Sequence, residues 1–174
     1  GAEFVKLLRD EAIACEGIIR SHDRITTTKF RIIGNNVQML RVDEEVTHPL
    51  THGDESRVLQ MFNYMMAAEK PDAIIFQDYD KGVITPKLIT EVIRRAQARG
   101  IPVSVDPKKK NFMFYQQVTM IKPNLKELKE GMNLQGEFQD QQSVINAAQM
   151  LRDKLKCQYV LTTMSEKGIM ISMS

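Results

Sequence analysis

The sequence predicts an α/β protein with a Rossmann-like, mostly parallel sheet and helices on both of its faces. Strand-like apolar runs alternate with amphipathic helical stretches over residues 54–174, and short loops join them. Crossovers between such strands are right-handed and make the sheet parallel. A β-hairpin at residues 25–43 precedes this alternation. We therefore expect one domain over residues 1–174, composed of a hairpin flap at 25–43 and an α/β core at 54–174.

The first 43 residues predict a helix and then the hairpin. Phe4, Leu7 and Leu8 recur at helical spacing within residues 1–17. The β-branched run "ITTTKFRII" and the run "VQMLRVD" flank a Gly-Asn-Asn turn, which indicates two paired strands. The alternation in the second strand does not settle which face of the hairpin is apolar.

The core follows from caps and periodicity. We expect Asp54 to cap one helix, and Thr85 with Pro86 to open the next, which Gly100 ends. A third helix opens at Pro123–Asn124, and a fourth carries its apolar stripe through Val144 to Leu155. The expected strands are apolar or β-rich runs, at 72–76, 101–106, 118–121, 158–164 and 169–174.

Composition narrows the classes of function. The formal net charge is +2, with 43% hydrophobic and 26% charged residues, so no polyanion such as nucleic acid is indicated. No apolar run reaches the roughly 20 residues that span a bilayer. Two cysteines are too few for a disulfide framework or a zinc site, and a reducing, cytoplasmic setting fits them. No glycine-rich dinucleotide motif and no P-loop occurs.

Polar residues follow four consecutive expected strands. These strand-end groups are Asp78–Gly82, Asp106–Lys108, Lys122–Asn124 and Thr162–Ser165. Ligands bind beyond the carboxyl ends of strands in such sheets, so the groups predict a site at that edge. Turn capping by the aspartates and plain solvent exposure of Lys81 and Lys108 remain open alternatives.

Asn124 and Glu127 admit two interpretations. Asparagine followed three residues later by glutamate is a capping arrangement on a first helical turn. The same residues can serve a nucleotide phosphate and its Mg²⁺, because helix N-termini favour phosphate and Mg²⁺ keeps most of its waters. Lys81 or Lys108 would then offset developing charge.

Five blocks of the sequence resemble the ribokinase-like (PfkB-type) sugar kinases, and among them the heptose-7-phosphate kinase domains of bacterial ADP-heptose synthases. The blocks are "TTTKFRIIGNNVQMLRVDEE", "DYDKGVITPKLI", "GIPVSVDPK", "TMIKPNLKEL" and "YVLTTMSEKGI". This resemblance implies transfer of the γ-phosphate of ATP, with Mg²⁺, to C1 of D-glycero-D-manno-heptose 7-phosphate, a step toward ADP-heptose for the lipopolysaccharide core.

Residue roles follow from the resemblance alone. It implies Glu127 as the metal residue and Lys81 and Lys108 as charge stabilisers. The implied nucleotide residues are Asn124, Leu125, Lys126, Glu127, Thr163, Ser165 and Gly168. The implied sugar-phosphate residues are Lys29 and Arg41. The flap would also pair subunits into a homodimer.

The sequence departs from the family at three places. The "GAGD" motif with the catalytic aspartate is absent and expected beyond residue 174, and the glycine-rich sugar-binding segment is missing. We therefore expect a central, partial kinase domain that is inactive alone. Ser165 stands where glycine is usual and would be strained at a positive φ. Two alternatives remain: another ribokinase-like carbohydrate or nucleoside kinase, and a non-catalytic nucleotide-binding module.

Overall fold

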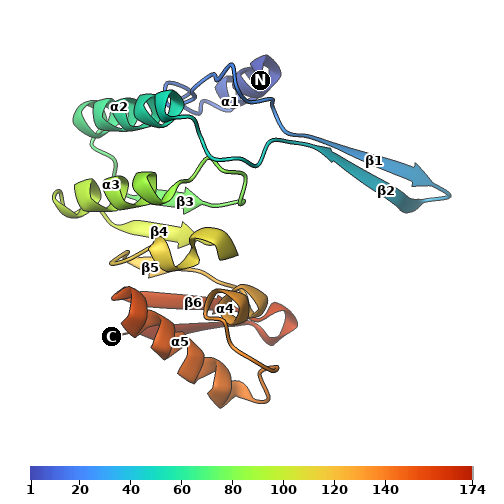
Figure 1. The fold of residues 1–174 in the computed structure, drawn as a ribbon, viewed down its shortest axis with the longest axis vertical. Coiled ribbons are helices and arrows are strands. Elements are labelled where there is room, and N and C mark those ends of the chain that lie inside the picture. Colours follow the sequence, from blue (N-terminus) through green and yellow to red (C-terminus); the bar gives the residue numbers. More distant parts are fainter. Residues whose placement is uncertain (174) are drawn as a thin grey trace.

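The computed structural model describes residues 1–173 and has two separate sheets (Figure 1). One is a two-stranded antiparallel hairpin, and the other has five strands in the order β3-β4-β5-β6-β7. The helices are α1 (Ala2–Asp10), α2 (His52–Ala68), α3 (Pro86–Gln97), α4 (Leu125–Gly131) and α5 (Gln141–Leu155), with 3₁₀ turns η1 (Lys109–Phe114) and η2 (Ser165–Lys167). The strands are β1 (Thr28–Gly34), β2 (Val37–Glu44), β3 (Ile74–Gln77), β4 (Val103–Asp106), β5 (Met120–Ile121), β6 (Tyr159–Thr163) and β7 (Ile169–Met173).

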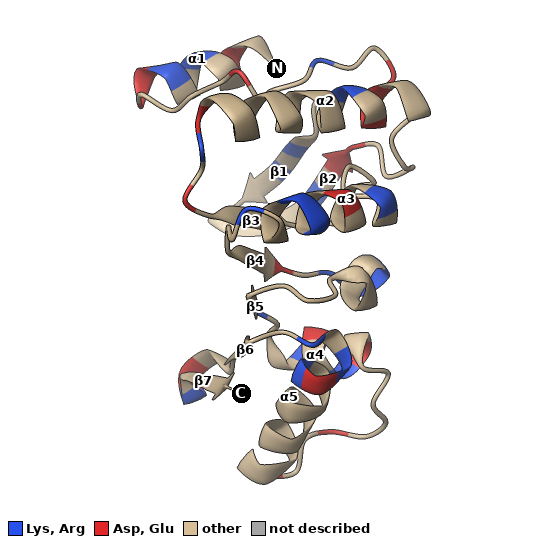
Figure 2. Ribbon diagram, turned by 90° about the vertical axis from the view of Figure 1, so that its left-hand side faces the viewer, with Lys and Arg blue, Asp and Glu red and all other residues tan. Residues whose placement is uncertain are grey.

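The five-stranded sheet confirms the predicted α/β class. Strands β3 to β6 pair in parallel and β7 pairs antiparallel with β6. The expected second layer of helices is absent from residues 1–173, because α3, α4 and α5 all lie on one face of the sheet (Figure 2). On the opposite face Ile75 and Ile171 are 71% and 53% exposed. The last residue of the expected strand at 169–174, Ser174, lies outside the described residues.

The core fills the space between the sheet and these helices. Ile121, Val105 and Val160 point from adjacent strands into it and are fully buried. Their partners include Ile89 of α3 and Leu151 of α5. Burial of such side chains contributes about 1.5–3 kcal/mol each, so this layer is the main source of stability.

Local signals set most helix starts correctly. Thr85 accepts a hydrogen bond from the Leu88 N–H at 3.2 Å, and Pro86 opens α3 as expected. The prediction for α2 was wrong: Thr51 rather than Asp54 is the cap, and it accepts from the Asp54 N–H. Asp54 lies in the first turn and is buried, where it accepts a hydrogen bond from Ser21. The earlier threonine satisfies the same free amides, so the helix starts one turn sooner.

Two elements are shorter than the sequence predicts. Helix α1 ends at Asp10, since Ala12 takes a positive φ of 55°, and α1 buries none of its residues. Strand β5 keeps only Met120 and Ile121 of the expected run 118–121.

None of the helices among residues 1–173 has the length and apolar character needed to cross a membrane.

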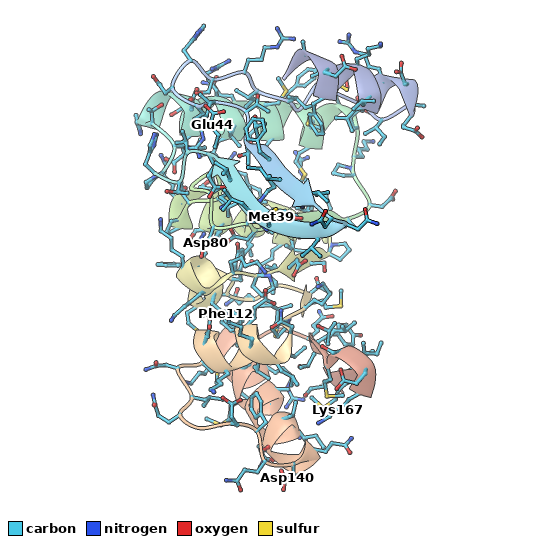
Figure 3. The ribbon with its side chains drawn as sticks, turned by 90° about the vertical axis from the view of Figure 1, so that its right-hand side faces the viewer. Met39, Glu44, Asp80, Phe112, Asp140 and Lys167 are labelled. Atoms are coloured by element: carbon cyan, nitrogen blue, oxygen red, sulfur yellow. The ribbon has the colours of Figure 1, made fainter. Side chains whose placement is uncertain are left out.

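The flap projects away from the rest of the molecule, with Met39 toward its end and Glu44 at its base (Figures 1 and 3). A bulge lies between Ile32 and Ile33, so Met39 is an extra residue on β2. An extra residue reverses the alternation of sides, which is why the sequence pattern of β2 did not reveal the apolar face.

The register separates the flap into two chemically different faces. Cross-strand partners share a face. Phe30 pairs with Val42, and Ile32 pairs with Leu40, which makes one face apolar. The pairs Lys29–Asp43 and Arg31–Arg41 make the other face charged. We call these the apolar flap face and the charged flap face.

Candidate functional site

The loop after β3 is held by a buried aspartate. Asp78 is almost fully buried and accepts hydrogen bonds from the Tyr115 hydroxyl at 2.7 Å and the Asn111 amide at 3.0 Å. Burial, and then the hydrogen bond to this carboxylate, raise the pKa of Tyr115. Asp78 therefore fixes residues 78–82 against η1 and has no oxygen pointing to solvent.

Lys81 joins this loop to the base of the flap. Its ammonium group forms an ion pair with Glu45. The next residue, Gly82, has φ of 76°, and a Cβ there would lie 2.0 Å from the His48 carbonyl oxygen. Only glycine fits this close approach of two backbone segments. The sequence Lys-Gly therefore anchors the flap beside the carboxyl end of β3.

A cavity of about 570 Å³ lies between the flap and the end of β3. Lys29 of the flap and Lys81 of the loop after β3 both line it, together with Asp78 and the exposed Tyr79. Because Lys29 belongs to the charged flap face, this face is directed toward the carboxyl edge of the sheet. The structure thus brings together two lysines that lie 52 residues apart in the sequence (81 minus 29).

Arg31 is a residue of this face that the sequence reasoning missed. It lies directly opposite Arg41, and like charges in this position repel. Asp43 accepts hydrogen bonds from Arg41 at 2.8 Å and from Lys29 at 3.2 Å. The Arg41 hydrogen bond, against opposing desolvation, lowers the pKa of Asp43. The carboxylate of Asp43 is therefore shared by Lys29 and Arg41, and Arg31 adds a third positive charge beside them. This excess of positive charge suits an anionic ligand. The two-residue spacing of Lys29 and Arg31 was the available signal.

Asn124 and Glu127 form a complete capping box at the start of α4. The Asn124 side chain accepts from the Glu127 N–H at 2.8 Å, and the Glu127 carboxylate accepts from the Asn124 N–H at 3.0 Å. The other carboxylate oxygen of Glu127 forms an ion pair with Lys108. Lys108 lies in the loop after β4, so the structure brings together side chains from two strand ends. Helix α4 has only 7 residues, and its dipole alone offers little to an anion.

Asp106 ties three strand ends together. It accepts from the Gln77 amide at 2.8 Å and from Lys122 at 3.1 Å. Burial is the largest influence and raises the pKa of Asp106, but these two hydrogen bonds and the charges of Lys122 and Lys108 together outweigh it and lower the pKa. Lys122 directly precedes Pro123 and Asn124. The contact therefore helps to fix the start of α4.

The turn at 163–168 lies beside the same edge. The Thr163 N–H donates to the Pro123 carbonyl at 3.0 Å, so Thr163 is adjacent to Asn124. Ser165 has φ of 53°. This is the positive φ at which a serine was expected from the sequence to be strained. Gly168 has φ of 90°, which suits glycine.

The other two expected nucleotide residues differ in exposure. Leu125 lines a cavity of about 260 Å³ with Phe138, Met164 and Lys167. The Lys126 side chain is 81% exposed and lies 3.9 Å from Glu130. No hydrogen bond or ion pair within residues 1–173 joins the flap residues Lys29 and Arg41, or Lys81, to the group around Glu127.

The side chains at this edge can hold a metal ion only if a bound ligand supplies further donors. Residues 1–173 contain no cluster of three or more His, Cys, Asp or Glu side chains that could hold a metal ion. Glu127 is a single carboxylate at a strand end. Mg²⁺ accepts such a site when phosphate and water supply its remaining ligands. Glu127 therefore fits a metal that arrives with a nucleotide, and does not fit a metal bound by protein alone.

Comparison with known proteins decides the family. All of residues 1–174 match the family described as pfkB family carbohydrate kinase. The chain belongs to the pfkB family of carbohydrate kinases. Membership implies use of a phosphoryl donor such as ATP, typically with a metal ion.

Individual relatives agree with this membership. The chain is similar to the bifunctional protein HldE of Wolinella succinogenes, with 33% identity over 97% of this chain and 35% of that protein. It shares 36% identity with HldE of Methylobacillus flagellatus, over 95% of this chain and 33% of that protein. The chain thus spans about a third of the length of these curated relatives.

Solved structures of two kinases show the same fold. Phosphofructokinase-2 from Escherichia coli, in its tetrameric inhibited form, superposes with a TM-score of 0.73 at 20% identity, over 99% of this chain and 56% of that one. Ribokinase from Giardia lamblia gives a TM-score of 0.72 at 17% identity, over 99% of this chain and 52% of that one.

Proposed function

We propose that this chain is the central part of an ATP- and Mg²⁺-dependent kinase that phosphorylates D-glycero-D-manno-heptose 7-phosphate at C1. The observation that carries the proposal is the similarity to HldE proteins over 95–97% of the chain, together with the heptose-kinase sequence blocks. The reaction would feed ADP-heptose synthesis in the cytoplasm.

The charged flap face suits the phosphate of the sugar substrate. Lys29, Arg31 and Arg41 carry three positive charges around the carboxylate of Asp43, and Glu45, whose charge also reaches Arg41, is paired with Lys81. Arginine forks match phosphate oxygens in pairs. The fork of Arg41 already holds both oxygens of Asp43, so Arg31 would act as the specificity clamp and Arg41 would add its charge. The cavity beside Lys29 and Lys81 gives room for the sugar.

The nucleotide belongs at the group around Glu127. Lys108 and Asn124 would contact phosphate, and Glu127 would face water-bound Mg²⁺. The turn from Thr163 through Ser165 to Gly168 would border the nucleotide, and Leu125 with its cavity offers an apolar wall to the base. The Lys126 side chain points to solvent, so among the predicted nucleotide residues it has the least structural support.

The apolar flap face suits a second copy of the chain. Phe30, Ile32, Leu40 and Val42 lie side by side and are 47–52% exposed. An isolated two-stranded hairpin is marginally stable in water and gains from burying such a face. A homodimer through the flap is therefore part of the proposal.

A substrate panel tests the function. The full-length protein is incubated with ATP and Mg²⁺ and with heptose 7-phosphate, fructose 6-phosphate, ribose or a nucleoside, and ADP release is measured. We expect the highest kcat/KM with heptose 7-phosphate, and a loss of that preference in Arg31→Ala. The 174-residue chain alone should show no turnover, since it lacks the "GAGD" aspartate.

The second candidate is another carbohydrate kinase of the same fold. Similarity of fold to phosphofructokinase-2 and ribokinase supports it. Preference for fructose 6-phosphate or ribose in the panel would establish it. A non-catalytic nucleotide-binding module would show a rise in melting temperature with ATP but no turnover with any substrate.

A further inference from the structure

The carboxylate of Glu127 has both oxygens engaged. One accepts from the Asn124 N–H at 3.0 Å, and the other is paired with the Lys108 ammonium group. The side chain of Glu127 is only 11% exposed. Each oxygen keeps a second acceptor site, but the ammonium group of Lys108 puts a positive charge directly on the carboxylate, and this charge would repel an approaching hydrated Mg²⁺.

The two partners differ in how easily they can leave. The Asn124 N–H belongs to the capping box of α4, so its departure would open the start of that helix. The Lys108 side chain is 38% exposed, so its ammonium group can turn from Glu127 toward solvent or a ligand. Its ammonium group is a compact charge on a flexible stem. Lys108 is the partner that can exchange.

We propose that Lys108 is an exchanging cation: it neutralises Glu127 in the nucleotide-free protein and moves to the nucleotide phosphate when the metal-bound nucleotide arrives. The displaced position in front of Glu127 is then taken by water-bound Mg²⁺. This inference rests on the proposed nucleotide site. It gives Lys108 a role that depends on Glu127, which a general charge stabiliser would not have.

The exchange predicts opposite effects of one mutation with and without metal. Without metal, Glu127 repels phosphate and retains Lys108. Glu127→Gln should then release Lys108 and strengthen nucleotide binding, while the amide preserves the cap. With Mg²⁺ present, the same change removes the carboxylate that faces the metal, so nucleotide binding should weaken.

The test is calorimetric titration of the full-length protein with the non-hydrolysable ATP analogue AMP-PNP, in EDTA and in excess Mg²⁺. In EDTA we expect Glu127→Gln to bind about threefold or more tightly, and this gain to vanish in the Lys108→Met background. Lys108→Met alone should weaken binding about tenfold in both buffers, the size of a charged hydrogen bond. Lys108→Arg should retain the wild-type affinity in EDTA.

Lys109→Met is the matched control, because it removes the same charge from the neighbouring residue. Unlike Lys108, Lys109 forms no ion pair within residues 1–173. It should change affinity less than about twofold. If the gain in Glu127→Gln persists without Lys108, or if Lys108→Met behaves like Lys109→Met, the exchange is wrong and the nucleotide site stands. If the wild-type protein binds no AMP-PNP in either buffer, both the nucleotide site and the exchange are wrong.

Discussion

The flap and the α/β core use similar β-rich sequence but differ in what holds them. In the core, strands β4 to β6 bury Val105, Ile121 and Val160 completely under one layer of helices. In the flap, every apolar side chain of β1 and β2 is at least 47% exposed. The core thus gains its stability within the chain, whereas the flap relies on local pairing and keeps its faces for a ligand or a partner. The expected effects of mutation should divide along the same line.

The largest difference should appear when the same leucine truncation is made in both regions. Leu151 of α5 is fully buried, and Leu151→Ala should lower the free energy of unfolding by about 2–5 kcal/mol through lost burial and a cavity. Leu40→Ala on the flap should change it by less than about 0.5 kcal/mol, since Leu40 is 52% exposed. Urea denaturation at low protein concentration measures both. Equal losses would mean that the flap is part of the folding core.

The apolar flap face should control self-association. Ile32→Asp should weaken a symmetric dimer about 100-fold, because each copy loses about 1.5 kcal/mol of apolar burial. Ile33→Asp is the control, since Ile33 is also exposed, at 66% against 52% for Ile32, but lies on the opposite face of the flap. Sedimentation equilibrium of both variants gives the dissociation constants. An unchanged dimer in Ile32→Asp, or a strict wild-type monomer, would exclude pairing through this face.

Glu127→Gln should affect chemistry without affecting the fold. In the full-length enzyme we expect turnover to fall at least about tenfold, which is about 1.4 kcal/mol of transition-state stabilisation. The melting temperature should move little, because glutamine can accept the same cap hydrogen bond. Mg²⁺ titrations of the kinase rate compare the two proteins. Superimposable curves would leave Glu127 as a helix cap only.

Ser165→Gly should stabilise the turn beside the nucleotide site slightly. Ser165 has φ of 53°, and a non-glycine residue in this left-handed region costs about 1–2 kcal/mol. Glycine also enlarges the freedom of the unfolded chain, so the net gain should be about 0.5–1 kcal/mol. Thermal denaturation measures it, with Ser172→Gly in the regular strand β7 as a control that should lose stability.

The smallest expected effect concerns the acid stability of the α/β core, through Glu55 of α2. Desolvation raises the pKa of Glu55, but hydrogen bonds from Thr85 and Lys87 and the charges of Lys87 and His52 together outweigh it and lower the pKa. A lowered pKa means that this contribution is present above the unfolded value, about 4.3, and is lost as pH falls through the folded value. Glu55→Gln should therefore flatten the loss of stability below about pH 4, as urea midpoints across pH would show. An unchanged slope would contradict this.

The sequence by itself determined the features that depend on neighbours in the chain. The Thr85–Pro86 start of α3, the capping box of Asn124 and Glu127, and the existence of the flap all follow from spacings of a few residues. The order of strands and helices follows from apolar periodicity, and with the motif blocks it sufficed to predict the α/β class and the kinase family.

Only the tertiary structure decided what depends on distant segments. The pairing of Lys108 with Glu127 joins residues from different strand ends, and the inclusion of Arg31 in the charged flap face depends on cross-strand register. The bulge at Met39 and the positive φ of Ser165 are backbone choices that composition does not encode. Asp54, which the sequence predicted as the cap of α2, is buried and accepts a hydrogen bond from the distant Ser21. Such contacts require the folded chain, because their free energy exists only once the sheet has brought its carboxyl ends to one edge.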